Sequence, residues 1–363
     1  MSDVAHAPPA PPTLPDAWRA FALDPPRAWG SPCGTARIRA TPEDFVVDEE
    51  LGFAPQGSGS HALLRVRKRG ANTDFVARQI AQAAGVRPMD VGFAGLKDRH
   101  AVTTQWFTVP LGKRTAASWD GATGDDWQVL EAHAHHRKLP RGALDANRFT
   151  LRLRDFDGDR DALAARLAAI AAHGIPNYFG PQRFGRQLSN LMPYVRASAG
   201  DRPRRLDDYA LSAGRSLIFN AVLARRVVDG TWNTLRDGDL ANLDARGSVF
   251  AVEAVDAAFL ERVALQDLHP TGPMWGSEPA NLAPVGDVQA LESEIAAGFA
   301  PVCEGLARVR MAPSRRALRL AVRELRWEFE PDGAVRLELL LRAGGYATTL
   351  LRELVETREG PRD

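Results

Sequence analysis

The sequence has only two cysteines, Cys33 and Cys303, far apart in a chain of 363 residues. This scarcity excludes a disulfide framework and a cysteine-based metal site, and it is typical of a reducing compartment. No apolar run is long enough to cross a membrane. The N-terminal segment also lacks the basic and apolar regions of a secretory signal. We therefore expect a cytoplasmic protein that does not bind membranes.

A strong excess of charge is also missing, because the formal net charge is only +1 at pH 7. Basic residues are nevertheless clustered in RVRKRG (65–70), HHRKLPRG (135–142), DRPRRL (201–206) and SRRALRL (314–320). Clustered arginine suits phosphate, since its planar guanidinium binds two oxygens at once. Lysine is nearly absent and arginine abundant, so the clusters also fit an ordinary solvated surface. Composition alone favours that surface over nucleic-acid binding.

Local patterns predict strands in the first half of the chain and again at its end. Residues 35–49 have the pattern of two strands joined by a proline turn, and residues 147–156 alternate cleanly between apolar and polar. Residues 72–85 and 159–174 are expected to be helices that end at glycines. A Pro-Asp-Gly turn within residues 324–345 predicts a final hairpin.

Residues between these β-rich parts have a different character. From residue 174 to 319 helical patterns dominate, and the first 30 residues are rich in proline and alanine. We therefore expect a disordered tail over 1–30 and an α/β (α+β) domain made of 31–173 and 320–363. An inserted helix-rich domain would occupy 174–319.

Several common catalytic motifs are absent from the sequence. It has no Walker-type phosphate loop, no G-x-G-x-x-G after a strand and no serine nucleophile elbow. His133 and His135 would share one face of a strand, but no third ligand or carboxylate partner is evident in the sequence. We therefore expect no metal site there, and favour polar residues that face RNA.

The stretch GFAGLKDRHAVTTQWF (92–107) places four charged or titratable residues between two apolar segments: Lys97, Asp98, Arg99 and His100. A charged turn is one explanation. Trp106 and Phe107, however, imply burial close by, and a carboxylate near a buried region needs a partner. An aspartate held among cations is expected to be ionised and can act as a nucleophile or a base. The pattern thus locates a candidate site without naming a reaction.

FAGLKDRHAVTTQWFTV (93–109) resembles the signature of the TruD family of tRNA pseudouridine synthases. Other segments resemble further motifs of that family in the same order, from about residue 35 to 356: RATPEDFVVDE, GALDANRFTLRLR, GIPNYFGPQRFGRQLSNL, LSAGRSLIFNAVL, RGSVFAV and GGYATTLLREL. The resemblance implies a catalytic domain with a mixed, mainly antiparallel sheet, interrupted by a helix-rich TRUD domain.

Carried over residue by residue, the resemblance implies the following site. Asp98 matches the catalytic aspartate, and Arg39 the basic residue beside it. Asn147 matches an amide that contacts the nucleotide, and Phe149 an aromatic that stacks on the target base. Phe45 and Tyr346 match aromatic positions near the pocket. Phe149 alternates with Leu151 and Leu153, so its pattern alone favours a core position. Residues expected to contact RNA are Lys97, Arg99, His100, Arg183 and Arg186, the last two in a loop that also fits simple packing by its own aromatics.

The implied reaction isomerises a tRNA uridine in the D arm, at position 13, to pseudouridine. It needs no cofactor, which agrees with the missing motifs. Asp98 would stabilise positive charge at C1′, capture C1′ covalently or remove the C2′ proton. We further expect a monomer without a protein partner. Two alternative functions remain: a non-catalytic RNA-binding or chaperone-like protein, and a base-excising glycosylase.

Overall fold

The computed structural model describes residues 13–201, 205–244 and 247–360. The chain divides into two compact units, one made of 29–175 with 320–363 and the other of 1–28 with 176–319. Short strands β9 (Ile175–Pro176) and β14 (Arg319–Leu320) pair with each other where the chain passes from one unit to the other.

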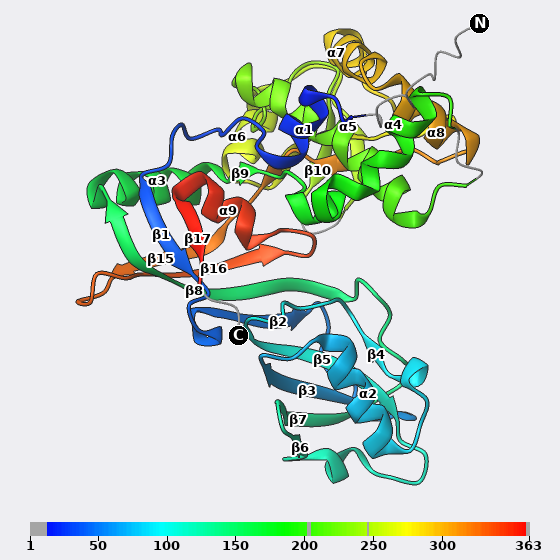
Figure 1. Cartoon of the computed structure of the whole chain (residues 1–363), viewed down its shortest axis with the longest axis vertical. Helices are drawn as coiled ribbons and strands as arrows, with labels where there is room; N and C mark the ends of the chain where they lie inside the picture. The colour runs from blue at the N-terminus through cyan, green and yellow to red at the C-terminus, as the bar shows by residue number, and fades with distance from the viewer. Residues whose placement is uncertain (1–12, 202–204, 245–246, 361–363) are drawn as a thin grey trace, which may run out of the picture. The chain divides into compact units, whose positions relative to one another are not determined.

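The unit formed by 29–175 and 320–363 is built on one large sheet (Figure 1). Its main order is β15-β16-β8-β2-β5-β3-β7-β6, with β1 and β4 added beside β8 and β5, and β17 beside β1. β2–β5 and β1–β17 are parallel, whereas the other pairs are antiparallel. The expected mixed, mainly antiparallel sheet is therefore confirmed. Its strands are β1 (Gly34–Ile38), β2 (Phe45–Leu51), β3 (His61–Arg69), β4 (Gly92–Phe93), β5 (Val102–Pro110), β6 (Thr123–Gly124), β7 (Trp127–His135), β8 (Leu144–Gly158), β15 (Arg323–Phe329), β16 (Val335–Arg342) and β17 (Glu356–Glu359).

Three helices pack on this sheet: α2 (Thr73–Ala84), α3 (Arg160–His173) and α9 (Ala347–Leu354). The predicted helices over 72–85 and 159–174 are confirmed, and each has a clear end signal. Asp159 accepts hydrogen bonds from the first-turn amides of α3, and Gly85 ends α2 with a left-handed φ of 72° that favours glycine. α3 and α9 bury their apolar sides with β8 and β16, whereas α2 packs with β3 and β5.

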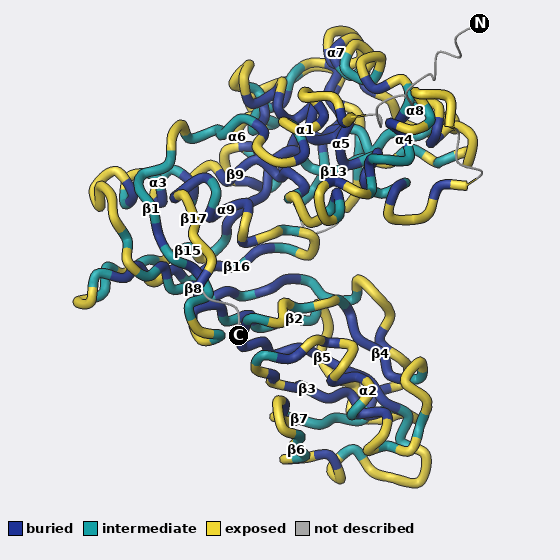
Figure 2. Tube along the Cα trace, viewed as in Figure 1, coloured by how far each residue is buried: buried dark blue, intermediate teal, exposed yellow. Residues whose placement is uncertain are grey.

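The strands bury side chains as the sequence pattern predicts. On β8, Phe149, Leu151 and Leu153 are buried, and their register places Leu339 opposite Phe149 and Leu337 opposite Leu151 on β16. β5 is buried on both faces along almost its whole length (Figure 2). A strand covered on both sides is the most rigid part of a sheet, so β5 gives a fixed end to the loop that precedes it.

The other unit contains six helices and a four-stranded sheet among its described residues. Its central helix, α5, is capped by Asp207, whose side chain accepts a hydrogen bond from the Ala210 amide at 2.7 Å. Arg226 on α5 forms a buried ion pair with Asp239 at 3.0 Å. The elements are α1 (Asp16–Leu23), α4 (Met192–Ser198), α5 (Asp208–Val228), α6 (Ala257–Ala264), α7 (Gly286–Ala297), α8 (Ala300–Arg308), β10 (Leu240–Leu243), β11 (Val249–Ala251), β12 (Leu268–Met274) and β13 (Ser314–Ala317).

The expectation of a disordered tail over residues 1–30 is wrong for α1, while residues 1–12 lie outside the described ranges. Trp18 is 5% exposed and stacks on Phe299 at 5.7 Å between ring centres. The Phe21 carbonyl accepts a hydrogen bond from Asn220 of α5 at 2.9 Å. The spacing of Trp18, Phe21 and Ala22 is that of an amphipathic helix, but the surrounding prolines obscured it.

Replacing Trp18 tests whether α1 is part of the folded unit. We expect Trp18→Ala to lower the free energy of unfolding of this unit by about 3–5 kcal/mol, because it removes a buried aromatic ring. The measurement is urea denaturation, with the exposed neighbour Arg19→Ala as the matched control. Equal stability of the two variants would contradict the packing role of α1.

Candidate active site

Asp98 lies in the loop between β4 and β5, and the backbone of this loop is held from two sides. The Lys97 amide donates to Oγ1 of Thr73, the first residue of α2, at 3.0 Å. That hydroxyl donates to Gln105 on β5, whose amide donates in turn to the Gly95 carbonyl. Thr73 and Gln105 are both buried, so these bonds are shielded from water. Asp98 is therefore presented by an ordered loop.

Arg39 reaches the Asp98 carboxylate, at 3.1 Å from Nη2 to Oδ2. The Arg39 side chain is 10% exposed and that of Asp98 46% exposed. Arg39 also donates to Glu359 at 3.1 Å, and its guanidinium lies 4.1 Å from the centre of the Phe45 ring. Its φ of 52° is unusual for a residue with a side chain. The guanidinium is thus fixed on three sides, and it fixes Asp98.

Lys97 points into the protein, where its ammonium joins two neighbouring strands. Its Nζ lies 2.6 Å from Oε2 of Glu49 on β2 and donates to Oδ1 of Asn147 on β8 at 2.8 Å. Glu49 and Asn147 are direct partners in the sheet register, and the Glu49 side chain is fully buried. Its other oxygen accepts from the Trp106 amide at 3.1 Å. Because its ammonium is already bound to Glu49 and Asn147, Lys97 is a poor candidate for the RNA contact expected of it.

Phe149, the predicted stacking aromatic, contacts Phe45, which was expected near the pocket. The ring of Phe149 meets that of Phe45 edge-on, at 6.1 Å between centres. Phe149 is 6% exposed and Phe45 3% exposed, and both belong to the core under α3 and α9. The structure therefore gives Phe149 a packing role in the core, as its alternation indicated. Tyr346, 37% exposed, lies just before α9 and four residues beyond the end of β16, whose Leu341 is opposite Asn147.

The remaining RNA-contact candidates are more accessible. Arg99 is exposed and donates to the Gly70 carbonyl at 3.3 Å, and His100 is half-buried. Arg183 and Arg186 belong to the other compact unit. Arg183 donates to the Ser212 hydroxyl at 2.9 Å, whereas Arg186 is exposed.

The two histidines of β7 have different surroundings. His135 is buried and stacks on Phe53 at 5.5 Å, while His133 lies 3.3 Å from Glu131. In the described ranges no three His, Cys, Asp or Glu side chains gather as metal ligands. No helix among those residues is long and apolar enough to span a bilayer.

Comparisons with known proteins match the chain to one family. The family described as "tRNA pseudouridine synthase D (TruD)" matches residues 27–192 and 194–354. The chain belongs to the TruD family. It is 48% identical to a tRNA pseudouridine synthase D of Methylococcus capsulatus, over 92% of this chain and 94% of the relative. A protein of the same name from Nitrosococcus oceani is 46% identical, over 90% of this chain and 92% of the relative.

A solved structure supports the fold. The crystal structure from Methanosarcina mazei, described as a candidate tRNA pseudouridine synthase D (TruD), aligns with a TM-score of 0.70. The alignment covers 94% of this chain and 98% of that one at 20% sequence identity. At this identity the likeness concerns the fold, and it confirms the expected α/β architecture of a TruD protein.

Two residues beside the candidate site of this TruD protein were missed in the sequence, Glu49 and Lys68. Lys68 is 1% exposed, and its ammonium donates to the carbonyl of Asp98 at 3.1 Å and to that of Ala71 at 2.7 Å. Burial lowers the pKa of Lys68 to about 8; the Asp98 carboxylate opposes this shift and the Lys97 cation adds to it. Both residues had a signal, because each continues the buried, alternating side of its strand.

The lowered pKa of Lys68 predicts a pH-dependent stability. Below pH 8 the lysine is charged in both states, and its burial disfavours the folded state. Between pH 8 and its usual pKa of 10.5 the folded protein releases this proton first. Over this range the free energy of unfolding of wild type should therefore rise with pH, relative to that of Lys68→Met, by up to about 1.4 kcal/mol per pH unit.

Chemical denaturation at a series of pH values measures this difference. Lys113→Met removes an exposed lysine and serves as the matched control. A difference between wild type and Lys68→Met that stays constant from pH 7 to 10.5 would contradict the shift.

Proposed function

We propose that this protein isomerises a uridine of tRNA, at position 13 in the D arm, to pseudouridine, and that Asp98 is the carboxylate that acts at C1′. One observation carries the proposal: Asp98 is half-exposed, held by Arg39, and adjacent to Lys97, which orients Asn147. A carboxylate that a ribose can reach thus lies beside an amide that can hold the base.

The reaction needs only these groups. The N1–C1′ bond breaks and its electron pair stays on the uracil, which leaves C1′ positively charged. After the uracil turns, C5 bonds to C1′, the C5 proton leaves and N1 gains a proton, so the product is an isomer. Asp98 can stabilise the charge at C1′, form a transient bond to C1′, or take the C2′ proton to give a glycal.

The hydrogen bond from Lys97 fixes which way the Asn147 amide points. An ammonium can only donate, so it must face Oδ1, and the NH₂ group of Asn147 is left to donate elsewhere. Uracil offers two carbonyl acceptors, O2 and O4. A half-turn of the ring that exchanges N1 and C5 also exchanges O2 and O4, so one fixed donor serves the base before and after it turns.

Arg39 contributes mainly by positioning the Asp98 carboxylate, and little through the energy of their ion pair. An ion pair whose carboxylate is 46% exposed contributes about 1 kcal/mol or less, because water screens it. Its guanidinium is nevertheless anchored to Glu359 and Phe45, so it holds the carboxylate in one place. Orientation of a reacting group is a large source of rate enhancement.

Access to the ribose requires that the uridine leave its stack, which costs a few kcal/mol. Within this proposal Arg99 and Arg186 contact phosphates that hold the tRNA. The protein acts in the cytoplasm as a monomer, without a protein partner or cofactor.

Replacing Asp98 tests the proposal directly. In tRNA labelled with 5-³H-uridine, wild type should release tritium, because C5 loses its proton. Asp98→Asn should lower the release rate by about 10³-fold or more, since it removes the group that acts at C1′. Its stability should change by about 1 kcal/mol or less, because the ion pair with Arg39 that it loses is half-exposed.

Two controls complete this experiment. A tRNA with cytidine at position 13 should release no tritium, and the product should contain pseudouridine and no free uracil. Free uracil would instead identify a glycosylase. Tritium release that persists in Asp98→Asn would overturn the assignment of Asp98.

Phe149 needs a variant that separates packing from stacking. Because Phe149 is buried, Phe149→Ala should cost about 3–5 kcal/mol of stability. Phe149→Leu keeps most of the volume and should cost less than about 1.5 kcal/mol. If the ring also stacks on uracil, Phe149→Leu will still lose about tenfold or more in turnover. Leu151→Met, two residues further on in the same core, is the control, and equal turnover of the two variants would leave Phe149 with packing alone.

A further inference from the structure

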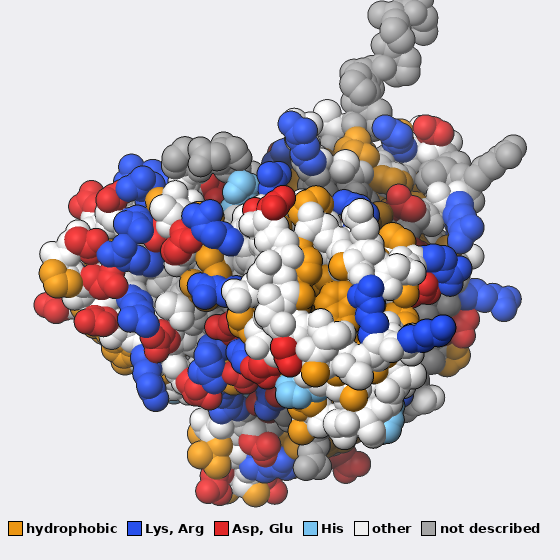
Figure 3. Space-filling view, turned by 90° about the horizontal axis from the view of Figure 1, so that it is seen from below, with side chains coloured by type: hydrophobic (Ala, Val, Ile, Leu, Met, Phe, Trp, Pro, Cys, Tyr) orange, Lys and Arg blue, Asp and Glu red, His pale blue; other side chains and the backbone are white. Residues whose placement is uncertain are grey.

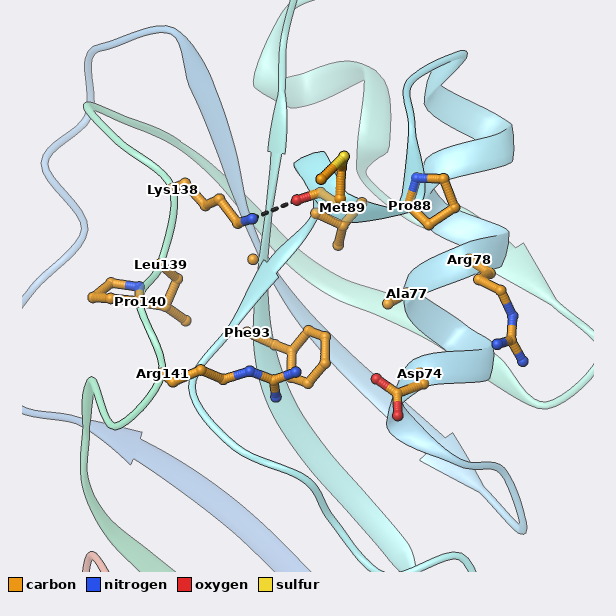
Figure 4. Close-up of a pocket in the computed structure, with 12 residues that line it drawn as sticks. Asp74, Ala77, Arg78, Pro88, Met89, Phe93, Lys138, Leu139, Pro140 and Arg141 are labelled. Atoms are coloured by element: carbon orange, nitrogen blue, oxygen red, sulfur yellow. Dashed lines mark hydrogen bonds between the residues drawn. The ribbon is translucent and has the colours of Figure 1, made fainter. Parts of the chain in front are cut away.

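A hollow of about 680 Å³ lies in the unit that carries Asp98. Figure 4 shows Lys138, Leu139, Pro140 and Arg141 along one side and the α2 residues along the other, with Phe93 between them. Met89 and Pro88 close a further side. Its volume is in the usual range of a pocket for a small ligand. None of the residues that line it belongs to the machinery proposed around Asp98.

Three cations line this hollow: Arg78, Lys138 and Arg141, against the single carboxylate of Asp74. All three cations are exposed, and no carboxylate of the described residues lies within ion-pair distance of any of them. Figure 3 shows that Lys and Arg are intermingled with Asp and Glu over part of one face of the molecule. In this unit about half of the described arginines are paired with carboxylates, namely Arg37, Arg39, Arg65, Arg69, Arg87, Arg148, Arg152, Arg154, Arg336, Arg342 and Arg352. With three cations against one carboxylate, the lining of the hollow has an excess of positive charge.

The wall that carries two of these cations is built into the sheet. The Leu139 amide donates to the Thr108 hydroxyl at 2.8 Å, and the Gly142 amide to the Ala94 carbonyl at 2.7 Å. Segment 138–142 lies so close to Gly92 that a Cβ there would be 2.7 Å from the Leu139 carbonyl oxygen. A larger residue at position 92 would push this wall away. The wall is therefore held in place before any ligand binds.

Two of the cationic side chains are also held. The Lys138 ammonium donates to the Met89 carbonyl across the hollow (Figure 4). The Arg141 guanidinium lies 3.6 Å from the centre of the Phe93 ring. A guanidinium plane on an aromatic ring offers its other face to a nucleobase, which is a common way to bind unstacked bases in RNA.

We propose that this hollow binds one nucleotide of the tRNA that flanks the target uridine, an inference that rests on the function proposed above. The base stacks on the Arg141 guanidinium, and Lys138 and Arg78 hold the adjoining phosphate. The Asp74 carboxylate repels phosphate from its side of the hollow and accepts hydrogen bonds from N–H groups of the base edge. Phe93 and Asp98 are five residues apart, so at most about 18 Å separates their Cα atoms, which is within reach of neighbouring nucleotides.

Binding of the full-length protein to a substrate tRNA transcript tests the hollow. Arg141→Ala should raise Kd about fivefold or more through lost stacking. Arg141→Lys keeps the charge but loses the planar surface, and should weaken binding nearly as much. Lys138→Ala should reduce the slope of log Kd against log salt by about 0.7, the value for one phosphate contact on a single strand. Arg114→Ala is the matched control, because Arg114 is exposed and lies over Trp119 at 5.9 Å but does not line the hollow.

Abasic substitutions in the tRNA identify the nucleotide that is bound. At one position flanking the target uridine, the abasic substitution and Arg141→Ala should be non-additive, because each removes the same contact. Additive effects at every flanking position, or Kd values for Arg141→Ala and Lys138→Ala equal to that of Arg114→Ala, would overturn the proposal. Tritium release by wild type is read separately, so failure of the hollow and failure of the proposed function remain distinguishable.

Discussion

The buried ammonium of Lys97 is the interaction on which the rest of the site depends. It connects Glu49 on β2 with Asn147 on β8 and fixes the residue that precedes Asp98. A buried carboxylate is tolerated only when it is paired, so Glu49 requires this lysine in this place. The loop, the amide and the two strands are therefore positioned together. Arg39 on one side and Lys68 beneath the backbone then complete the support of Asp98.

Much of the fold could be predicted from local patterns. The helices over 72–85 and 159–174 had clear end signals, and β8 had clean alternation. α1 was missed, because prolines on both sides of a short amphipathic segment resemble a tail. Its helix is stabilised by contacts with Phe299 and Asn220, which local propensity does not contain.

The site was predictable in its location but less so in its chemistry. The charged residues around Asp98 and the likeness to a family predicted the position of the site in the chain. The direction of each side chain depends on partners far away in the sequence, such as Glu49 for Lys97 and Arg39 for Asp98. Lys97 was expected to contact RNA, yet its ammonium is bound to Glu49 on β2 and Asn147 on β8 inside the protein.

The most direct measurement is the structure of the Asp98→Asn protein bound to a substrate tRNA. The account predicts that the target uridine is extruded, with C1′ within about 3.5 Å of the side chain at position 98. One uracil carbonyl should accept a hydrogen bond from the Asn147 amide while Lys97 remains bound to its Oδ1. A uridine that stays stacked in the tRNA, or a C1′ out of contact with position 98, would contradict it.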